Sequence, residues 1–108
     1  MPFTAGTLAD GQVASSLGTL YTVPGATKAY IKTITIFNTS ATPQEVYIQI
    51  KRSGGTTRKY RKFELALDES ADVLSPGTSL QLSTGDIIEA VTTTASVVDY
   101  TITGVLET

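Results

Sequence analysis

Alternation of apolar and polar side chains is the feature that most constrains this fold. Residues 44–51, QEVYIQIK, place Val46, Ile48 and Ile50 on one side and the intervening residues on the other. A period of two indicates a β-strand with one buried face and not a helix. Similar short runs recur along the chain and are separated by turn residues, such as the Ser-Gly-Gly at 53–55. Together with an abundance of threonine, which favours strands, the pattern predicts an all-β protein.

The alternating runs define the expected strands. They cover residues 19–23, 29–38, 44–51, 57–67, 79–83, 86–91 and 96–107. In the second run the apolar positions slip by one near Lys32 and Thr33, which predicts a β-bulge. Pro24-Gly25 favours a type II turn, and a further turn is expected at 75–77. The chain of 108 residues predicts one antiparallel β-sandwich, jelly-roll-like, or a small barrel of about seven or eight strands.

The beginning of the chain has a different character. Residues 1–18 show no clear period, and we expect them to form an extended N-terminal arm that precedes a sandwich domain at 19–108. The scattered apolar residues Phe3, Leu8 and Val13 are the expected contacts of this arm with a partner.

Composition argues against several classes of function. The chain contains no histidine and no cysteine, so we expect neither a transition-metal site nor a Ser-His-Asp or Cys-His relay. Asp86 and Glu89 are too poorly spaced for an acid–base pair, because an odd separation places them on opposite faces of one strand. No apolar run approaches the ~20 residues that cross a bilayer. We therefore expect a non-enzymatic protein with no cofactor, no metal and no membrane partner.

Positive charge is concentrated in one hairpin, at residues 51–62. This basic hairpin comprises Lys51, Arg52, Arg58, Lys59, Arg61 and Lys62. It is interpreted as a contact for an acidic protein surface, as a contact for phosphates, or as a solvated edge whose charges prevent strand addition. Nucleic-acid binding is disfavoured, because only Tyr60 interleaves the charges and the net charge of the chain is −2.

An acidic group follows the basic hairpin. Asp68, Glu69 and Asp72 lack the alternating spacing of a calcium loop, so a solvated loop is favoured. The same residues are possible charge partners for the basic hairpin of a neighbouring copy, which would make the surface self-complementary.

A distinctive order of short motifs runs from residue 18 to residue 105. LYTVP is followed by FNTS, by KRSGG, by GDIIE and by a closing VDYTITGV. In this arrangement the chain resembles a family of small all-β structural proteins of tailed bacteriophages. The motifs consist of turns and core positions, so the resemblance carries over no functional residue.

The resemblance implies a virion protein at the capsid surface. The leading hypothesis is a capsid decoration (cement) protein that binds the major capsid protein at capsomer junctions and associates with itself, as a homotrimer or another symmetric homo-oligomer. The alternative is a tail, head-fibre or adaptor component, or a module that binds host glycans. For glycan binding the outward Tyr47 is the candidate platform.

Overall fold

The chain forms an all-β sandwich. The computed structural model describes residues 3–74, 79–94 and 97–108, and these contain nine strands and no helix. The strands are β1 (Phe3–Gln12), β2 (Gly18–Thr22), β3 (Lys28–Asn38), β4 (Gln44–Lys51), β5 (Thr57–Leu65), β6 (Ser70–Asp72), β7 (Leu80–Leu82), β8 (Ile87–Thr92) and β9 (Val98–Glu107). The all-β prediction is confirmed.

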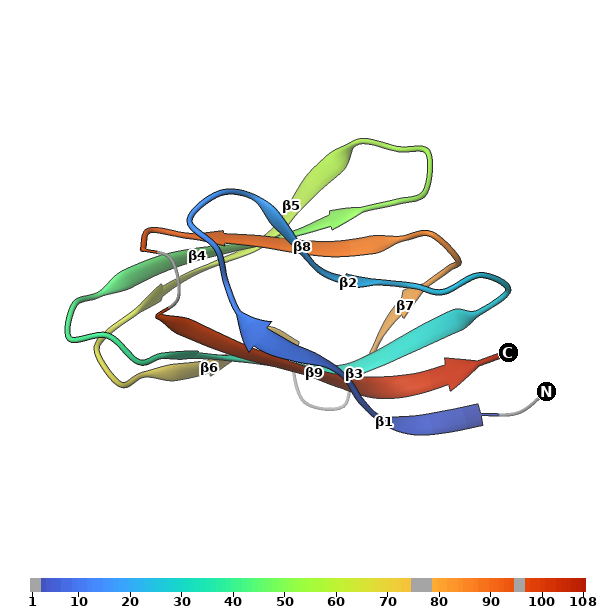
Figure 1. Ribbon diagram of the computed structural model, residues 1–108, viewed down its shortest axis with the longest axis horizontal. Helices are drawn as coiled ribbons and strands as arrows, with labels where there is room; N and C mark the ends of the chain where they lie inside the picture. Colours follow the sequence, from blue (N-terminus) through green and yellow to red (C-terminus); the bar gives the residue numbers. More distant parts are fainter. Residues whose placement is uncertain (1–2, 75–78, 95–96) are drawn as a thin grey trace.

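Two antiparallel sheets lie face to face (Figure 1). One has the order β1-β9-β3-β6, with β7 also paired to β3. The other has the order β2-β8-β4-β5, so β5 forms one of its edges. Strands that are distant in sequence, such as β3 and β9, lie side by side, and long-range pairing therefore holds the fold together.

The core lies between the sheets and is built from the alternation seen in the sequence. Ile31, Ile34 and Ile36 of β3 are fully buried, as are Val46 and Ile48 of β4. Each such side chain contributes roughly 1.5–3 kcal/mol by leaving water. In β3 and β4 one face therefore supplies stability, and the opposite face is not part of the core.

The predicted β-bulge in the second run is confirmed. The register between β3 and β9 shifts between Ile31 and Thr33, which leaves Lys32 as the additional residue. Nearby, Gly104 of β9 lies against the backbone of Tyr30, and a Cβ atom at that position would collide with the Tyr30 carbonyl oxygen. A glycine is therefore required where the two strands approach most closely.

Two local predictions need correction. The left-handed residue after Pro24 is Ala26, with φ of 54°, and not Gly25, so the turn lies one residue later than predicted. Strand β5 ends at Leu65, and Leu67 is 57% exposed because the chain turns away through Asp68, at φ of 55°. The turn expected at 75–77 lies outside the described residues.

The N-terminal segment lies on the sandwich. Residues 3–12 form β1, which pairs along its length with β9. Val13 is fully buried, and its amide donates a hydrogen bond to the carbonyl oxygen of Val98. In this conformation the segment predicted as an arm is a strand of the sheet, because it satisfies the backbone groups of β9 that would otherwise form the edge.

Candidate protein interface

The basic hairpin consists of β4, β5 and the tight turn between them (Figure 1). Gly54 has φ of 72°, and the amide of Gly55 donates to the carbonyl oxygen of Arg52 at 2.8 Å. The Ser-Gly-Gly turn predicted from the sequence is thus confirmed. Since β5 pairs with β4 on one side only, its charged side chains lie at the open edge of the four-stranded sheet.

A second bulge separates the charges of β5 by type. The register shifts between Ile48 and Gln49, so that Arg61 and Lys59 face these consecutive residues and Tyr60 is the additional residue. Paired residues lie on the same face of a sheet. By simple alternation, without the bulge, each face would carry one arginine and one lysine. With the bulge, both lysines lie on one face and both arginines on the other.

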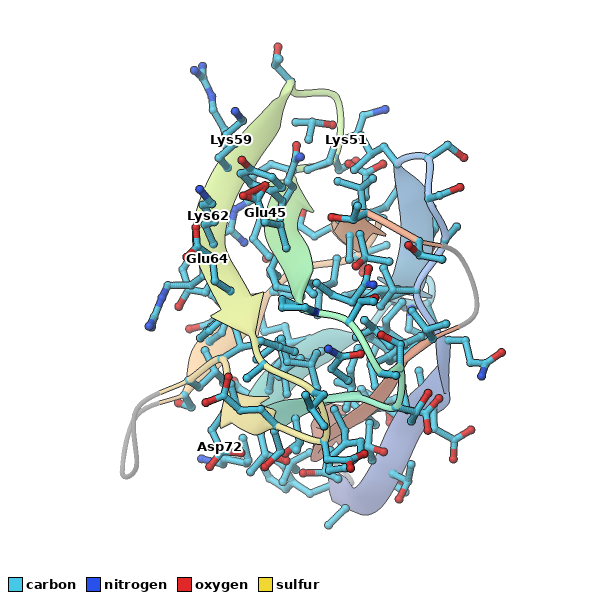
Figure 2. The ribbon with its side chains drawn as sticks, turned by 90° about the vertical axis from the view of Figure 1, so that its left-hand side faces the viewer. Glu45, Lys51, Lys59, Lys62, Glu64 and Asp72 are labelled. Carbon is cyan, nitrogen blue, oxygen red and sulfur yellow. The ribbon has the colours of Figure 1, made fainter. Side chains whose placement is uncertain are left out.

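Lys59 and Lys62 lie along β5 (Figure 2). The register with β4 places both on the outer face, beside Tyr47. The Nζ atoms of Lys59 and Lys62 lie 5.2 and 5.7 Å from the centre of the Tyr47 ring, within cation–π range. Lys62 also lies 3.7 Å from Glu45 and 3.5 Å from Glu64. Glu45, then Tyr47 and Glu64, raise the pKa of Lys62, so this lysine stays charged.

The arginines lie on the face that continues the core. Arg58 pairs with the buried Ile50, and Arg61 with the buried Ile48. Arg61 donates a hydrogen bond to the carbonyl oxygen of Val73 at 3.0 Å and stacks 5.0 Å from the ring of Phe63. These contacts hold its guanidinium between β5 and the segment that follows β6.

A shallow hollow lies beside Arg58. It has a volume of about 170 Å³ and is lined by Ile50, Arg52, Arg58, Lys59, Tyr60 and Leu80. Aliphatic and aromatic carbon forms part of its wall, and cationic side chains form the rest. Such a hollow suits a carboxylate side chain with an apolar stem better than an uncharged group.

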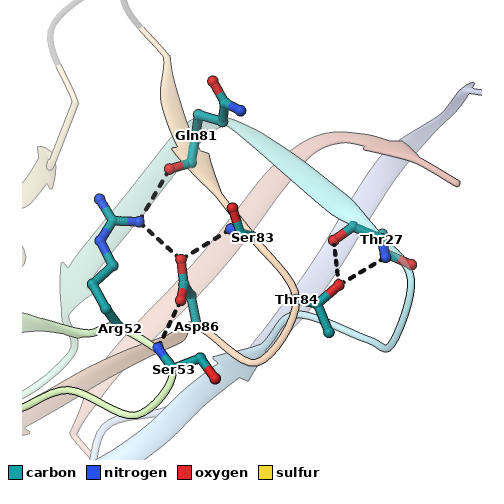
Figure 3. Close-up of polar contacts among 7 residues, drawn as sticks. All are labelled: Thr27, Arg52, Ser53, Gln81, Ser83, Thr84 and Asp86. Atoms are coloured by element: carbon teal, nitrogen blue, oxygen red, sulfur yellow. Dashed lines mark hydrogen bonds and ion pairs between the residues drawn. The ribbon is translucent and has the colours of Figure 1, made fainter.

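Asp86 fixes the turn of the basic hairpin (Figure 3). Its side chain is buried and accepts hydrogen bonds from the amides of Ser53 at 2.8 Å and Ser83 at 2.9 Å. Arg52 Nη1 lies 2.9 Å from Asp86 Oδ2 and also donates to the carbonyl oxygen of Gln81. The β4–β5 turn and the β7–β8 turn are therefore held together by one carboxylate.

The environment of Asp86 keeps the carboxylate ionised. Burial acts to raise its pKa, but the hydrogen bonds from the Ser83 and Ser53 amides and from Arg52, together with the arginine charge, outweigh burial. The pKa of Asp86 therefore lies below its ordinary value. Arg52 is thereby neutralised within its own chain, as Lys62 is by Glu45 and Glu64, whereas Arg58 and Lys59 form no ion pair in the described part of the chain.

The predicted charge partners do not pair with the basic hairpin of the same chain. Glu69 accepts a hydrogen bond from the amide of Ala66 at 2.7 Å, and Asp72 accepts one from the hydroxyl of Thr35 at 3.0 Å. Asp68 occupies the left-handed turn after β5. No ion pair joins any of the three acidic residues to a cation within the described part of the chain. Their pairing with another copy stays a prediction.

The three apolar residues of the predicted arm have different surroundings. Phe3 is 63% exposed, Leu8 packs partly against the core, and Val13 is fully buried. Within this conformation, Phe3 offers the most surface to a partner, whereas Val13 is a core residue and offers none.

Sequence reasoning missed two determinants of this surface. The Asp86–Arg52 contact joins residues 34 positions apart. The turn sequence Ser83-Thr84-Gly85 before Asp86 indicates that the aspartate side chain bonds to the backbone of a turn, but it does not indicate Arg52 as a partner. The bulge at Tyr60 had no apolar signal, because polar residues occupy both faces of β5.

The described residues also bear on two other kinds of site. Among them, no group of three or more His, Cys, Asp or Glu residues is arranged to hold a metal ion. Within the same ranges, no helix is long and apolar enough to span a membrane.

Comparison with known proteins gives little guidance. No protein-family model and no curated protein sequence matches the chain. Two solved structures align with it, those of infectious bursal disease virus strains Gt and Gx, at 14% and 15% identity and TM-scores of 0.39. Each alignment covers 97% of this chain but 32% of the other, so this chain spans about a third of the length of those it aligns with.

Proposed function

We propose that the chain is a non-enzymatic structural protein of a virion and that it acts as a capsid decoration protein. In this role β5 and its cations contact an acidic patch of the major capsid protein at the outer surface of the shell. The bacteriophage-like order of motifs and the all-β sandwich support the virion role.

One observation carries the choice of β5 as the contact surface. Arg58 and Lys59 are exposed, and within the described ranges no carboxylate lies close enough to form an ion pair with either. This occurs in a chain whose net charge is −2. Charges left unpaired inside their own chain are available for an oppositely charged partner, which they steer and orient.

The rigidity of the hairpin supports the same role. Asp86 holds its turn, and the contacts of Arg61 with Val73 and Phe63 hold β5. A preorganised surface loses little conformational freedom on binding. Each contact on the shell is small, but many copies bound to one shell, or a symmetric oligomer with several contacts, gain affinity through multivalency.

The geometry around Tyr47 favours this proposal over glycan binding. A sugar ring stacks on an open aromatic face. Here the ammonium groups of Lys59 and Lys62 lie over the Tyr47 ring. A ligand that stacked on Tyr47 would have to compete with these lysines for the ring.

Charge reversal at Arg58 and Lys59 tests the proposal. We expect Arg58→Glu/Lys59→Glu to weaken binding to shells that lack this protein by at least about tenfold, because attraction becomes repulsion. The matched control, Arg58→Gln/Lys59→Gln, should weaken binding less. Both changes are exposed and should leave the fold stable within roughly 0.5 kcal/mol each. Binding is measured by cosedimentation with purified shells.

The same variants separate partner binding from edge protection. Glutamates protect a strand edge as well as lysines do. If β5 only guards an edge, the glutamate variant binds shells like the unmodified protein, and its binding does not respond to salt. That outcome would remove β5 from the interface.

A further inference from the structure

The edge of the other sheet differs in charge from β5. Strand β1 forms one edge of the β1-β9-β3-β6 sheet and pairs along Phe3–Gln12 with β9 alone. Its ten residues, FTAGTLADGQ, include one charged side chain, Asp10, and no proline. The backbone N–H and C=O groups that point away from β9 have no strand beside them in the described chain. Proteins usually protect such an edge with charge, proline or a short strand.

The remaining edges within the described residues are shorter or more charged than β1. β5 carries four cations, β2 has five residues, and β6 and β7 have three residues each. Two copies of β5 placed side by side would oppose like charges. Among these edges, β1 is the one whose length and charge permit strand addition.

We propose that β1 pairs antiparallel with β1 of a second copy of this chain, about a two-fold axis, so that the two five-stranded sheets become one. This inference deepens the proposed function by naming the surface of self-association. We take the partner of β1 to be β1 of a second copy, because in one register two β1 strands match each other in side-chain face and in charge.

The bulge in β1 determines the register. Opposite β9, the extra residue of β1 is Leu8, between Thr7 and Ala9. As a result, Phe3, Ala5, Asp10 and Gln12 all lie on the outer face of the sheet, on the two sides of the bulge.

When β1 pairs antiparallel with β1 of the second copy, one register places outer residues opposite outer residues. In this register Phe3 lies opposite Gln12, and Ala5 lies opposite Asp10. Thr4 then lies opposite Gly11, and Gly6 opposite Ala9, on the inner face. The two-fold axis passes through the bulge, so each half of the strand pairs with the other half of its partner.

This register avoids unfavourable charge. The carboxylate of Asp10 lies opposite the methyl group of Ala5, and the two aspartates lie on opposite sides of the axis. Like charges directly opposite would destabilise the pair. An isologous contact of this kind produces a dimer and differs from the homotrimer considered from the sequence.

A matched pair of charges at one exposed position tests the register. Ala5→Asp places a new carboxylate opposite Asp10 twice, once on each side of the axis, and should raise the dimer dissociation constant by about tenfold. Ala5→Lys places an ammonium group opposite the same carboxylate and should leave the constant unchanged or lower it. Dissociation constants are measured by sedimentation equilibrium on the purified chain, at low and high salt.

Two results would overturn the inference. The first is an unmodified protein that remains monomeric throughout the concentration range. The second is an equal weakening by Ala5→Asp and Ala5→Lys, because general protection of an edge does not depend on the sign of the charge. Neither measurement involves shells, so a failure here leaves the binding of β5 to the capsid standing, and the converse also holds.

Discussion

Asp86 is the residue on which the shape of the basic hairpin depends most. We predict that Asp86→Asn lowers the free energy of unfolding by about 1–3 kcal/mol, because the amide cannot accept hydrogen bonds at both positions where the carboxylate does. Chemical denaturation at neutral pH measures the loss. The control is Asp68→Asn, an exposed acid in a left-handed turn that asparagine tolerates, and it should change stability by less than about 0.5 kcal/mol.

The same residue sets a dependence of stability on pH. The pKa of Asp86 is lowered in the folded chain, so its contribution is fully present above the unfolded value of about 3.9 and is lost as pH falls through the folded value. The stability difference between the unmodified chain and Asp86→Asn should therefore shrink in acid. A difference that stays constant as pH falls through this range would show that the ionised carboxylate is not responsible.

Residues in the core were easier to predict than residues of the surface. Alternation identified Val46, Ile48 and Ile50 as buried, because burial imposes a period of two. The partner of Asp86 was not predictable, because long-range polar contacts leave no period in the sequence. For the same reason, the division of arginines and lysines between the faces of β5 became visible only in the register with β4.

Among the elements, β1 is a strand whose pairing the apolar pattern did not predict. Its sequence has glycines and little alternation, so it was predicted as an arm, yet it pairs with β9 over ten residues. An edge strand with an exposed outer face needs little apolar patterning, because few of its side chains enter the core. The bulge in β3, in contrast, was predictable because it interrupts a strong apolar pattern.

Removing this strand tests its place in the fold. We expect deletion of residues 2–12 to lower the Tm by more than about 5 °C, which corresponds to roughly 1 kcal/mol in a domain of this size. The reason is that β9 loses its partner and becomes the edge. Phe3→Ala, which truncates an exposed side chain, is the control and should leave the Tm nearly unchanged. An unchanged Tm in the deletion would instead establish residues 1–18 as the separable arm that the sequence predicted.

Across the whole molecule, the two sheets present different surfaces. The four-stranded sheet ends in the basic hairpin, while Asp72 lies on the other sheet, apart from the labelled lysines (Figure 2). The outer face of the five-stranded sheet carries Asp10, Asp72 and Asp99, and on the same face the hydroxyls of Thr33 and Thr103 are hydrogen-bonded to each other. A compact body with one basic edge and one edge that carries a single charge can meet a shell and a second copy at the same time.

The copy number of this chain in purified particles tests the virion role most directly. Quantitative mass spectrometry gives its ratio to the major capsid protein. A capsid decoration protein should be present in a simple, shell-wide ratio to that protein. A handful of copies per particle would move the chain to the portal, tail or fibre, and absence from particles would contradict a virion role.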